Sequence, residues 1–506
     1  MSIATNILWY GVAPLPGTRE KLEIRGFQVM ENPPSESVKD SLLGATSVVV
    51  VNQLSTDSNE IAALCKLIPR FIDHGIRIVF LAEDRAERLR IREQALVQVS
   101  PVYPWDREVR FAPNLKGIHF DHIVRFERGP KWTGCHIKEI GPEEKLTEDE
   151  RRLVDRAFPK AQEIHLRKIA PGFSGSKVFM AYEKRLEAES SVAHWTQPRL
   201  VKINKREPLG REVRAMELVS PFVPFELRPN LERFVEGFHK AVYVADFVDK
   251  SESLLDAVRA GRAEAAISNL FNRTLHRWRD RARQTIMSDE PLVTAAERLK
   301  MISPQEIQHE YLDSEPIQRE QIDPVGLWQS LQDIKFPHRV ATIHGDLHGE
   351  NVRVRGDDAI LIDLGAVKGD TEVGMGAPLC FDVAMLEVAL VFTYRGSEDG
   401  PDVFDQSEWK GEITPYYTLD AILSSCPHVE LEPKPDSWLF GCLQRIRAFG
   451  IYEQSDSFEY PIALVVAMWR WCKFQAASNA DRGRRVVALE LGAKLSEEII
   501  RKRNRD

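Results

Sequence analysis

The chain has 506 residues, a formal net charge of −8 and 28% charged residues. A chain of this length exceeds what one hydrophobic core usually serves, so we expect two or three domains. The mildly acidic balance argues against nucleic acid as a partner, because nucleic-acid binding usually needs a basic field.

The cysteines and the hydropathy pattern indicate the cellular compartment in which the protein is expected. Six cysteines are scattered without a close pair, which argues against a zinc site or a disulfide framework and fits a reducing environment. Residues 1–6 show no basic segment ahead of an apolar run, and no apolar run is long enough to span a membrane. We therefore expect a cytoplasmic protein without a membrane partner.

Strand and helix patterns alternate over residues 1–125. Apolar segments predict strands and amphipathic segments predict helices, in turn at residues 6–11, 18–25, 26–30, 35–43, 46–52, 59–74, 76–82 and 85–96. The unbroken valines 48–51 are typical of a strand buried on both faces of a parallel sheet. This alternation predicts an α/β domain with a flavodoxin-like, doubly wound sheet.

The same order of elements resembles a response-regulator receiver domain, with two departures. Residues 11–14 are Gly-Val-Ala-Pro, where a receiver carries acidic residues, and Asn52 stands where a receiver carries its phosphorylated aspartate. A neutral amide cannot form an acyl phosphate. The resemblance therefore implies a pseudo-receiver that serves in docking or dimerisation. A flavodoxin-like domain with another use is the equal alternative.

A glycine-rich turn is predicted beyond a connector at residues 126–160, whose segment 143–158 is a charged helix. Residues 169–180 predict a strand, a turn and a second strand. Within the turn, Gly172 and Gly175 would let backbone N–H groups approach phosphate oxygens, because glycine has no Cβ. A plain hairpin turn is the alternative.

An apolar strand with a single lysine, Lys202, is predicted at residues 199–203. The next segment, 209–219, has apolar residues at a helical spacing. Glu212 on this helix is the expected partner that orients Lys202, with Glu217 as the alternate. The competing interpretation of Lys202 is an edge-strand lysine that points to solvent.

The strongest motif is residues 342–351, Thr-Ile-His-Gly-Asp-Leu-His-Gly-Glu-Asn. Asp346 and Asn351 lie five positions apart, so both can face one phosphate from a loop. Asp363 follows in Leu-Ile-Asp-Leu-Gly, where it can complete a magnesium site from the next hairpin. Phosphoryl transfer needs such a set, with a carboxylate that accepts a hydroxyl proton and oxygen ligands for Mg²⁺.

The pattern His-Gly-Asp-x-His-x-x-Asn, followed by two apolar residues and Asp, resembles the aminoglycoside phosphotransferase and choline kinase branch of the kinase-like fold. Gly345 and His348 stand where protein kinases carry Arg and Lys. The resemblance covers roughly residues 160–480. It implies a bilobal α+β phosphotransferase with an N-lobe at 161–248 and a C-lobe at 249–506 that contains helical acceptor-binding segments.

The resemblance also implies where a nucleotide binds. ATP would lie between the two lobes, with Lys202 on its α- and β-phosphates. The glycine-rich turn would cover the phosphates, and the end of the strand at 242–248 would form the hinge that pairs with adenine. The implied nucleotide-binding residues are Gly172, Ser174, Gly175, Ser176, Lys202, Glu212, Asp246 and Phe247.

Catalytic roles follow from the same resemblance. Asn351 and Asp363 would hold Mg²⁺, and Asp346 would orient and deprotonate the acceptor hydroxyl. Asp382, in the segment Phe-Asp-Val-Ala, would support the catalytic loop from below. His344 and His348 are expected to hold the loop by hydrogen bonds rather than to act as bases.

The sequence therefore predicts an ATP- and Mg²⁺-dependent phosphotransferase that acts on a hydroxyl of a small molecule. The alternative is a regulatory or signalling kinase-like protein that acts on, or docks to, a protein partner through residues 1–125. A homodimer formed through the same residues is a further expectation. The sequence does not name the acceptor, because variable helical segments build that pocket.

Overall fold

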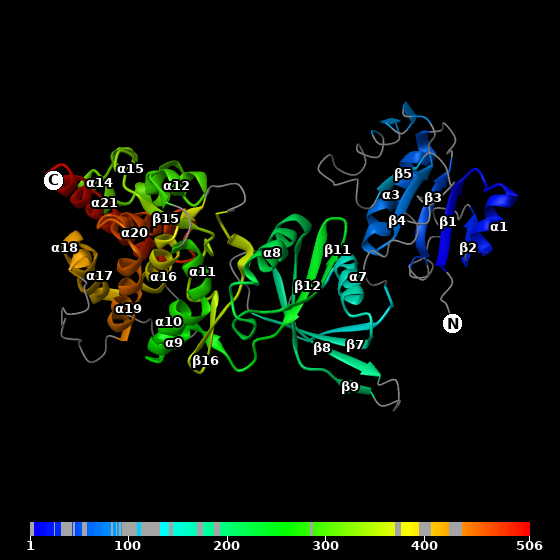
Figure 1. Ribbon diagram of the computed structural model, residues 1–506, viewed down its shortest axis with the longest axis horizontal. Helices are drawn as coiled ribbons and strands as arrows, with labels where there is room; N and C mark the ends of the chain where they lie inside the picture. The colour runs from blue at the N-terminus through cyan, green and yellow to red at the C-terminus, as the bar shows by residue number, and fades with distance from the viewer. Residues whose placement is uncertain are drawn as a thin grey trace. The chain divides into compact units, whose positions relative to one another are not determined.

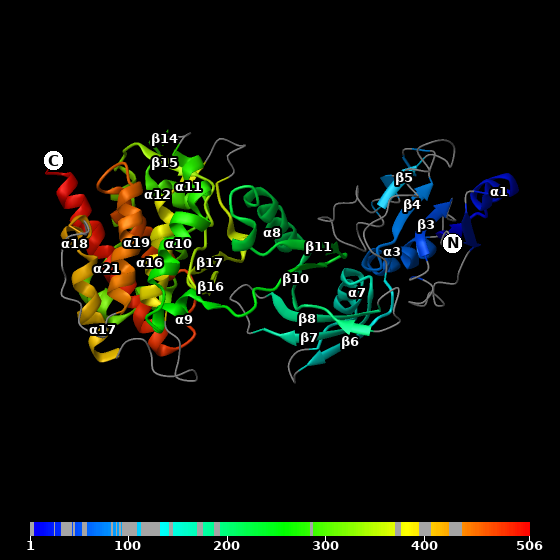
Figure 2. The same ribbon diagram turned by 60° about the horizontal axis from the view of Figure 1, so that its bottom comes forward.

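The computed structural model describes residues 5–24, 26–31, 43, 46–52, 58–81, 84, 86–87, 89–90, 93, 109–112, 132–140, 145–169, 176–186, 193–283, 287–369, 376–393, 406–424 and 438–505. They form two compact units (Figures 1 and 2). Unit 1 comprises residues 1–213 and 230–247, and unit 2 comprises 214–229 and 248–506. Both units mix helices and strands. The division into four segments expected from the sequence, at 1–125, 126–160, 161–248 and 249–506, stays a prediction.

A five-stranded parallel sheet forms the first part of unit 1, in the order β2-β1-β3-β4-β5. Its strands and helices are β1 (Thr5–Gly11), α1 (Pro16–Ile24), β2 (Phe27–Glu31), β3 (Thr46–Asn52), α3 (Ser58–Asp73), β4 (Arg77–Leu81) and β5 (Val109–Ala112). This is the strand order of flavodoxin-like sheets, while a pseudo-receiver stays a prediction. The helices expected at 35–43 and 85–96 fall mostly outside the described residues.

Both faces of this sheet are buried, which explains the valine run. Val48 and Val50 pack in one cluster with Leu22 of α1. Val49 and Val51 pack in a second cluster with residues of α3. Because successive strand residues point to opposite faces, a strand covered on both sides must be apolar at every position.

A mostly antiparallel sheet forms the second part of unit 1, in the order β11-β12-β10-β8-β7-β6, with β9 paired to β8. Its elements are β6 (His136–Ile140), α7 (Glu148–Ala157), β7 (Ala161–Lys168), β8 (Lys177–Leu186), β9 (Ala193–Trp195), β10 (Arg199–Lys205), α8 (Arg206–Val219), β11 (Leu231–Glu236) and β12 (Lys240–Asp246). The expected connector therefore contains an edge strand, β6, which pairs parallel with β7.

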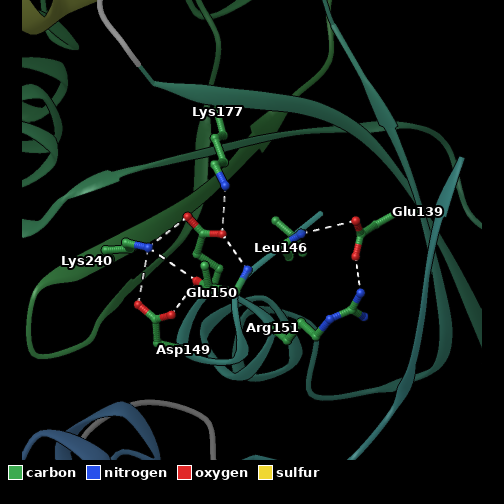
Figure 3. Close-up of polar contacts among 8 residues, drawn as sticks. Glu139, Leu146, Asp149, Glu150, Arg151, Lys177 and Lys240 are labelled. Atoms are coloured by element: carbon green, nitrogen blue, oxygen red, sulfur yellow. Dashed lines mark hydrogen bonds and ion pairs between the residues drawn. The ribbon is translucent and has the colours of Figure 1, made fainter. Parts of the chain in front are cut away.

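Helix α7 is fixed to this sheet by a buried carboxylate, Glu150 (Figure 3). Glu150 accepts a hydrogen bond from the backbone N–H of Thr147 at 2.8 Å, as in a capping box. It also accepts from Lys177 of β8 and Lys240 of β12, each at 3.0 Å. Burial raises the pKa of Glu150, but these donors outweigh it and hold the pKa below its usual value.

The two sheets of unit 1 share a core at Phe238, in the turn between β11 and β12. The Phe238 ring packs in the α3 cluster of the parallel sheet, and its N–H donates to Asp73 at the end of α3 at 2.8 Å. Arg156 of α7 donates to the Asp73 carbonyl at 2.8 Å and to the Glu236 carbonyl at 3.2 Å. These contacts join elements that lie far apart in the sequence.

Unit 2 is mainly helical around two small sheets, β13-β16-β17 and β14-β15-β18. Its strands are β13 (Glu252–Ser253), β14 (Met287–Ser288), β15 (His338–Ala341), β16 (Val352–Arg355), β17 (Asp358–Leu361) and β18 (Ala377–Pro378). Its helices are α9 (Leu254–Arg259), α10 (Glu264–Asn269), α11 (His276–Arg283), α12 (Leu292–Arg298), α13 (His309–Leu312), α14 (Glu315–Glu320), α15 (Pro324–Gln332), α16 (Cys380–Phe392), α17 (Gln406–Ile413), α18 (Leu419–Leu423), α19 (Trp438–Glu453), α20 (Glu459–Trp471) and α21 (Asn479–Arg503).

Helices α16, α19, α20 and α21 pack together as the core of unit 2 (Figure 1). A buried ion pair joins Glu387 of α16 to Arg447 of α19 at 2.8 Å, and the Tyr460 hydroxyl of α20 donates to the same carboxylate at 2.8 Å. Among the described residues, no helix is both long and apolar enough to cross a membrane.

The shared core predicts that Phe238→Ala destabilises unit 1. The ring is only 4% exposed, and truncation of a buried Phe usually costs about 3–5 kcal/mol. The matched control is Phe225→Ala, because that ring is 67% exposed. Urea unfolding followed by circular dichroism should show a lower midpoint for Phe238→Ala alone. Equal midpoints for both variants would contradict the shared core.

Candidate active site

Lys202 and Glu212 form a buried ion pair in unit 1. Strand β10 lies between β8 and β12, so Lys202 is on an interior strand, and the edge-strand interpretation is wrong. Its Nζ lies 2.8 Å and 3.0 Å from the two carboxylate oxygens of Glu212. The Tyr243 hydroxyl donates to Glu212 at 2.9 Å. Glu217 is exposed, so Glu212 is confirmed as the partner of Lys202.

The other expected nucleotide-binding residues are placed only in part. Gly172, Ser174 and Gly175 lie outside the described residues. Ser176 precedes β8, and its hydroxyl accepts a hydrogen bond from Asn204 of β10 at 2.8 Å.

Asp246 ends β12, as the expected hinge requires. Its carboxylate accepts from the Asn230 amide at 3.2 Å and lies 3.6 Å from the Arg199 guanidinium. Phe247 follows and is half-buried. The roles of both residues in adenine binding stay predictions.

The loop of residues 342–351 in unit 2 is held by Asp382, in the first turn of α16. The Asp382 carboxylate accepts from the backbone N–H of His344 at 2.7 Å and of Gly345 at 2.9 Å. These contacts agree with the expected role of Asp382 as a support for the loop. His344 holds the loop as well, because its Nδ1 accepts from the Asp346 N–H at 3.3 Å and its Nε2 lies 3.2 Å from the Ile362 carbonyl.

Asn351 and Asp363 stand at the same end of the β16–β17 hairpin. Asn351 directly precedes β16, and its carbonyl accepts from the N–H of Ile362, the residue before Asp363, at 2.8 Å. The Asn351 amide nitrogen donates to the Asp346 carbonyl at 3.0 Å. Hairpin pairing thus brings Asn351 next to the residue before Asp363, and the amide ties Asn351 to the backbone of Asp346.

Asp346 is paired with a residue that the sequence motif did not include, Arg470 near the end of α20. The guanidinium donates to Asp346 Oδ1 at 2.8 Å, and His348 Nε2 lies 3.7 Å from Asp346 Oδ2. Burial raises the pKa of Asp346, but the charge of Arg470 and the nearby histidines outweigh it and hold the pKa below its usual value. Asp346 is therefore a carboxylate near neutral pH.

A pocket opens beside Asp346 in unit 2. Helices α16 and α20 supply its apolar wall, and Arg470 and His348 supply polar groups. The lining residues are Asp346, Leu347, His348, Met385, Val388, Ala389, Ala467, Arg470 and Trp471. Its volume of about 20 Å³ is close to that of a single water molecule and far below the roughly 300–1,000 Å³ of small-molecule sites.

The residues expected to hold Mg²⁺ fit that ion chemically. Asn351 offers an amide oxygen whose nitrogen is fixed by Asp346, and Asp363 offers a half-buried carboxylate. Mg²⁺ prefers oxygen ligands and usually takes only one or two from protein side chains, with phosphates and water filling the rest. In the described part of the chain, no cluster of three or more His, Cys, Asp or Glu side chains could hold a metal.

No protein-family model and no curated protein matches the sequence. Several solved structures are similar. A glucosamine kinase in complex with glucosamine, ADP and inorganic phosphate matches over 70% of this chain and 86% of its own, with 13% identity and a TM-score of 0.36. An aminoglycoside phosphotransferase from Streptomyces rimosus matches over 58% and 96%, with 15% identity and a TM-score of 0.27.

The same Streptomyces rimosus enzyme in complex with ADP and streptomycin matches over 56% of this chain and 92% of its own. Its identity to this chain is 16%, and its TM-score is 0.27. At such low sequence identities and TM-scores, the structural similarity supports no conclusion about the activity of this chain. The chemistry of this chain therefore has to be inferred from its own residues.

Gly345→Ala should destabilise unit 2 more than a matched glycine replacement. Gly345 has a φ of +75°, and a Cβ there would lie 2.3 Å from the Ala366 carbonyl oxygen. Gly356 also has a positive φ, +60°, but its Cβ would meet nothing within 4 Å. Both variants bear left-handed strain of about 1–2 kcal/mol. Only Gly345→Ala adds a clash, typically worth about 1–3 kcal/mol. Equal unfolding free energies in urea would contradict this loop geometry.

Proposed function

We propose that this protein is an ATP- and Mg²⁺-dependent phosphotransferase that moves the γ-phosphate of ATP to a hydroxyl of a small molecule. The observation that carries the proposal is the set Asp346, Asn351 and Asp363, gathered on a braced loop and one hairpin end. This set contains a carboxylate for the acceptor and two oxygen ligands for a metal, as phosphoryl transfer requires.

Lys202 is the proposed nucleotide-binding cation. Its ammonium group is buried and oriented by Glu212, so it would meet the α- and β-phosphates without a large loss of side-chain entropy. Asn351 and Asp363 would hold Mg²⁺, which would neutralise charge on the phosphate oxygens. Residues 170–176, Asp246 and Phe247 remain the proposed contacts to phosphate and adenine.

Asp346 is the proposed group that orients the acceptor hydroxyl and accepts its proton. Arg470 occupies Oδ1, so Oδ2 is the oxygen that we assign to the acceptor. Arg470 also keeps the carboxylate ionised, as an acceptor of protons must be. The pocket wall of α16 and α20 would hold the acceptor.

A small molecule is favoured over a protein as the acceptor by one feature of the sequence. Asp382 follows Asp363 by only 19 positions, which leaves little chain for a segment that presents a protein substrate.

A regulatory role remains the second candidate, and the parallel sheet of unit 1 favours it. That sheet contains none of the residues proposed to contact the nucleotide, the metal or the acceptor. In this alternative, residues 1–125 dock a protein partner or a second copy of the chain.

Asp346→Asn should lower phosphate transfer by about 10²–10⁴, the usual contribution of a positioned base. The measurement is transfer from γ-labelled ATP into the small-molecule fraction of a cell extract. Asp358→Asn is the control, because Asp358 pairs with Arg273 on the surface. Wild-type transfer by a folded Asp346→Asn protein would overturn the assignment.

Asp363→Ala should abolish the Mg²⁺-dependent part of the thermal stabilisation by ATP, because it removes a proposed metal ligand. Lys202→Met should weaken nucleotide binding with and without Mg²⁺, because the ammonium contacts phosphate directly. Asp358→Ala again serves as the control. Stabilisation of Asp363→Ala by MgATP that equals the wild type would exclude this metal site.

A further inference from the structure

The turn between β11 and β12, residues 236–240, is the meeting point of three helices in unit 1. Its first contacts are with the parallel sheet. Phe238 packs its ring among buried residues of α3, and its N–H donates to the Asp73 carboxylate at 2.8 Å. The 236–240 turn is therefore anchored on the parallel sheet by both an apolar and a polar contact.

Helix α7 adds a second set of contacts to the 236–240 turn. At its C-terminal end, buried Arg156 donates to the carbonyls of Asp73 and Glu236, at 2.8 Å and 3.2 Å. One guanidinium thus bridges the end of α3, whose last carbonyls have no helical partner, and the end of β11. At its N-terminal end, Glu150 accepts from Lys240 of the turn (Figure 3).

The packing around Gly237 is too close for any side chain. A Cβ on Gly237 would lie 2.6 Å from Asp73 Oδ1 and 2.9 Å from Leu153 Cδ2 of α7. A larger residue at position 237 would have to displace the side chains of Asp73 and Leu153, so the turn packs closely against both α3 and α7.

Helix α8 is tied to the same turn by its first residue, Arg206. The Arg206 N–H donates to the His239 carbonyl at 2.9 Å. Its side chain donates to the Glu236 carboxylate at 3.2 Å and to the Gly237 carbonyl at 3.3 Å. Glu212, the partner of Lys202, lies further along this helix.

We propose that the parallel sheet of residues 5–112 is a positioning element for nucleotide binding. By holding the 236–240 turn, it fixes the start of α8 and so keeps Glu212 beside Lys202. The inference rests on the proposed role of Lys202. The hydrogen bond between Lys202 and Glu212 is charge-assisted and 2.8 Å long. It would be lost if its donor and acceptor atoms moved apart by more than about half an ångström. A displaced turn would therefore loosen the start of α8 and leave the Tyr243 hydroxyl as the remaining contact that holds Glu212 beside Lys202.

The test is Arg156→Met in the full-length chain, with MgADP binding measured by calorimetry. We expect the dissociation constant to rise about tenfold, within the usual range of coupling between sites. Arg151→Met is the matched control, because Arg151 lies on the same helix but bonds to Glu139 and the Ile137 carbonyl instead. The control should bind MgADP as the wild type does.

A double-mutant cycle separates positioning from general loss of structure. If Arg156 acts through Lys202, then Arg156→Met should cause no further loss of MgADP affinity in a Lys202→Met background. Additive losses would overturn the proposal, and so would wild-type affinity of a folded Arg156→Met protein. If Arg156→Met does not fold, Asp73→Asn and Gly237→Ala carry the same test on the other side of the turn.

Hydrogen exchange of the α8 amides distinguishes failure of this inference from failure of the proposed function. If the wild type does not bind MgADP, the proposed function fails. Faster exchange in α8 of Arg156→Met, but not of Arg151→Met, then still supports the coupling. Unchanged exchange in α8 overturns it.

Discussion

The geometry of the loop of residues 342–351 depends on one buried carboxylate, Asp382. Burial raises the pKa of Asp382, and the loop N–H groups of His344 and Gly345 oppose that effect. A buried carboxylate is costly unless donors surround it, so the loop and the aspartate require each other. Asp346 follows Gly345 directly, so α16 helps to set its position together with the contacts that His344 and Asn351 make within the loop.

The position of α16 is set in turn by a second buried charge. Glu387 of α16 is bound by Arg447 of α19 and Tyr460 of α20, and all three side chains are almost fully buried. Such a pair adds little net stability compared with apolar residues, but it admits few alternative helix registers. The same helix, α20, brings Arg470 to Asp346. One core therefore fixes both the support of the loop and the charge beside its carboxylate.

The sequence was informative about residues whose interaction partners lie close to them in the chain. Lys202 and Glu212 could be paired because α8 follows β10 at once, so the strand and the helix confine the possible partners. Asn351 and Asp363 could be brought together because a short hairpin links them. The valines of β3 likewise identified a strand with two buried faces.

Residues joined only by tertiary packing escaped the same reasoning. Arg470 lies 124 positions from Asp346, and a single arginine that ends an apolar helix has no pattern of its own. Phe238 has no signal in the sequence, because its hydrogen-bond partner Asp73 on α3 is 165 positions away. The edge strand β6 was not predicted. Its residues alternate between exposed and half-buried positions, so the segment looks like a connector in the sequence.

The shared core around Phe238 has a consequence for synthesis of the chain. Ribosomes deliver α3 long before the turn that covers it, since β6 to β11 must all be translated in between. At a synthesis rate of roughly 5–20 residues per second, the apolar surface of α3 stays uncovered for several seconds or longer. During that interval the nascent parallel sheet exposes an apolar surface to solvent and to other proteins. A chaperone that binds the emerging polypeptide would bind this surface.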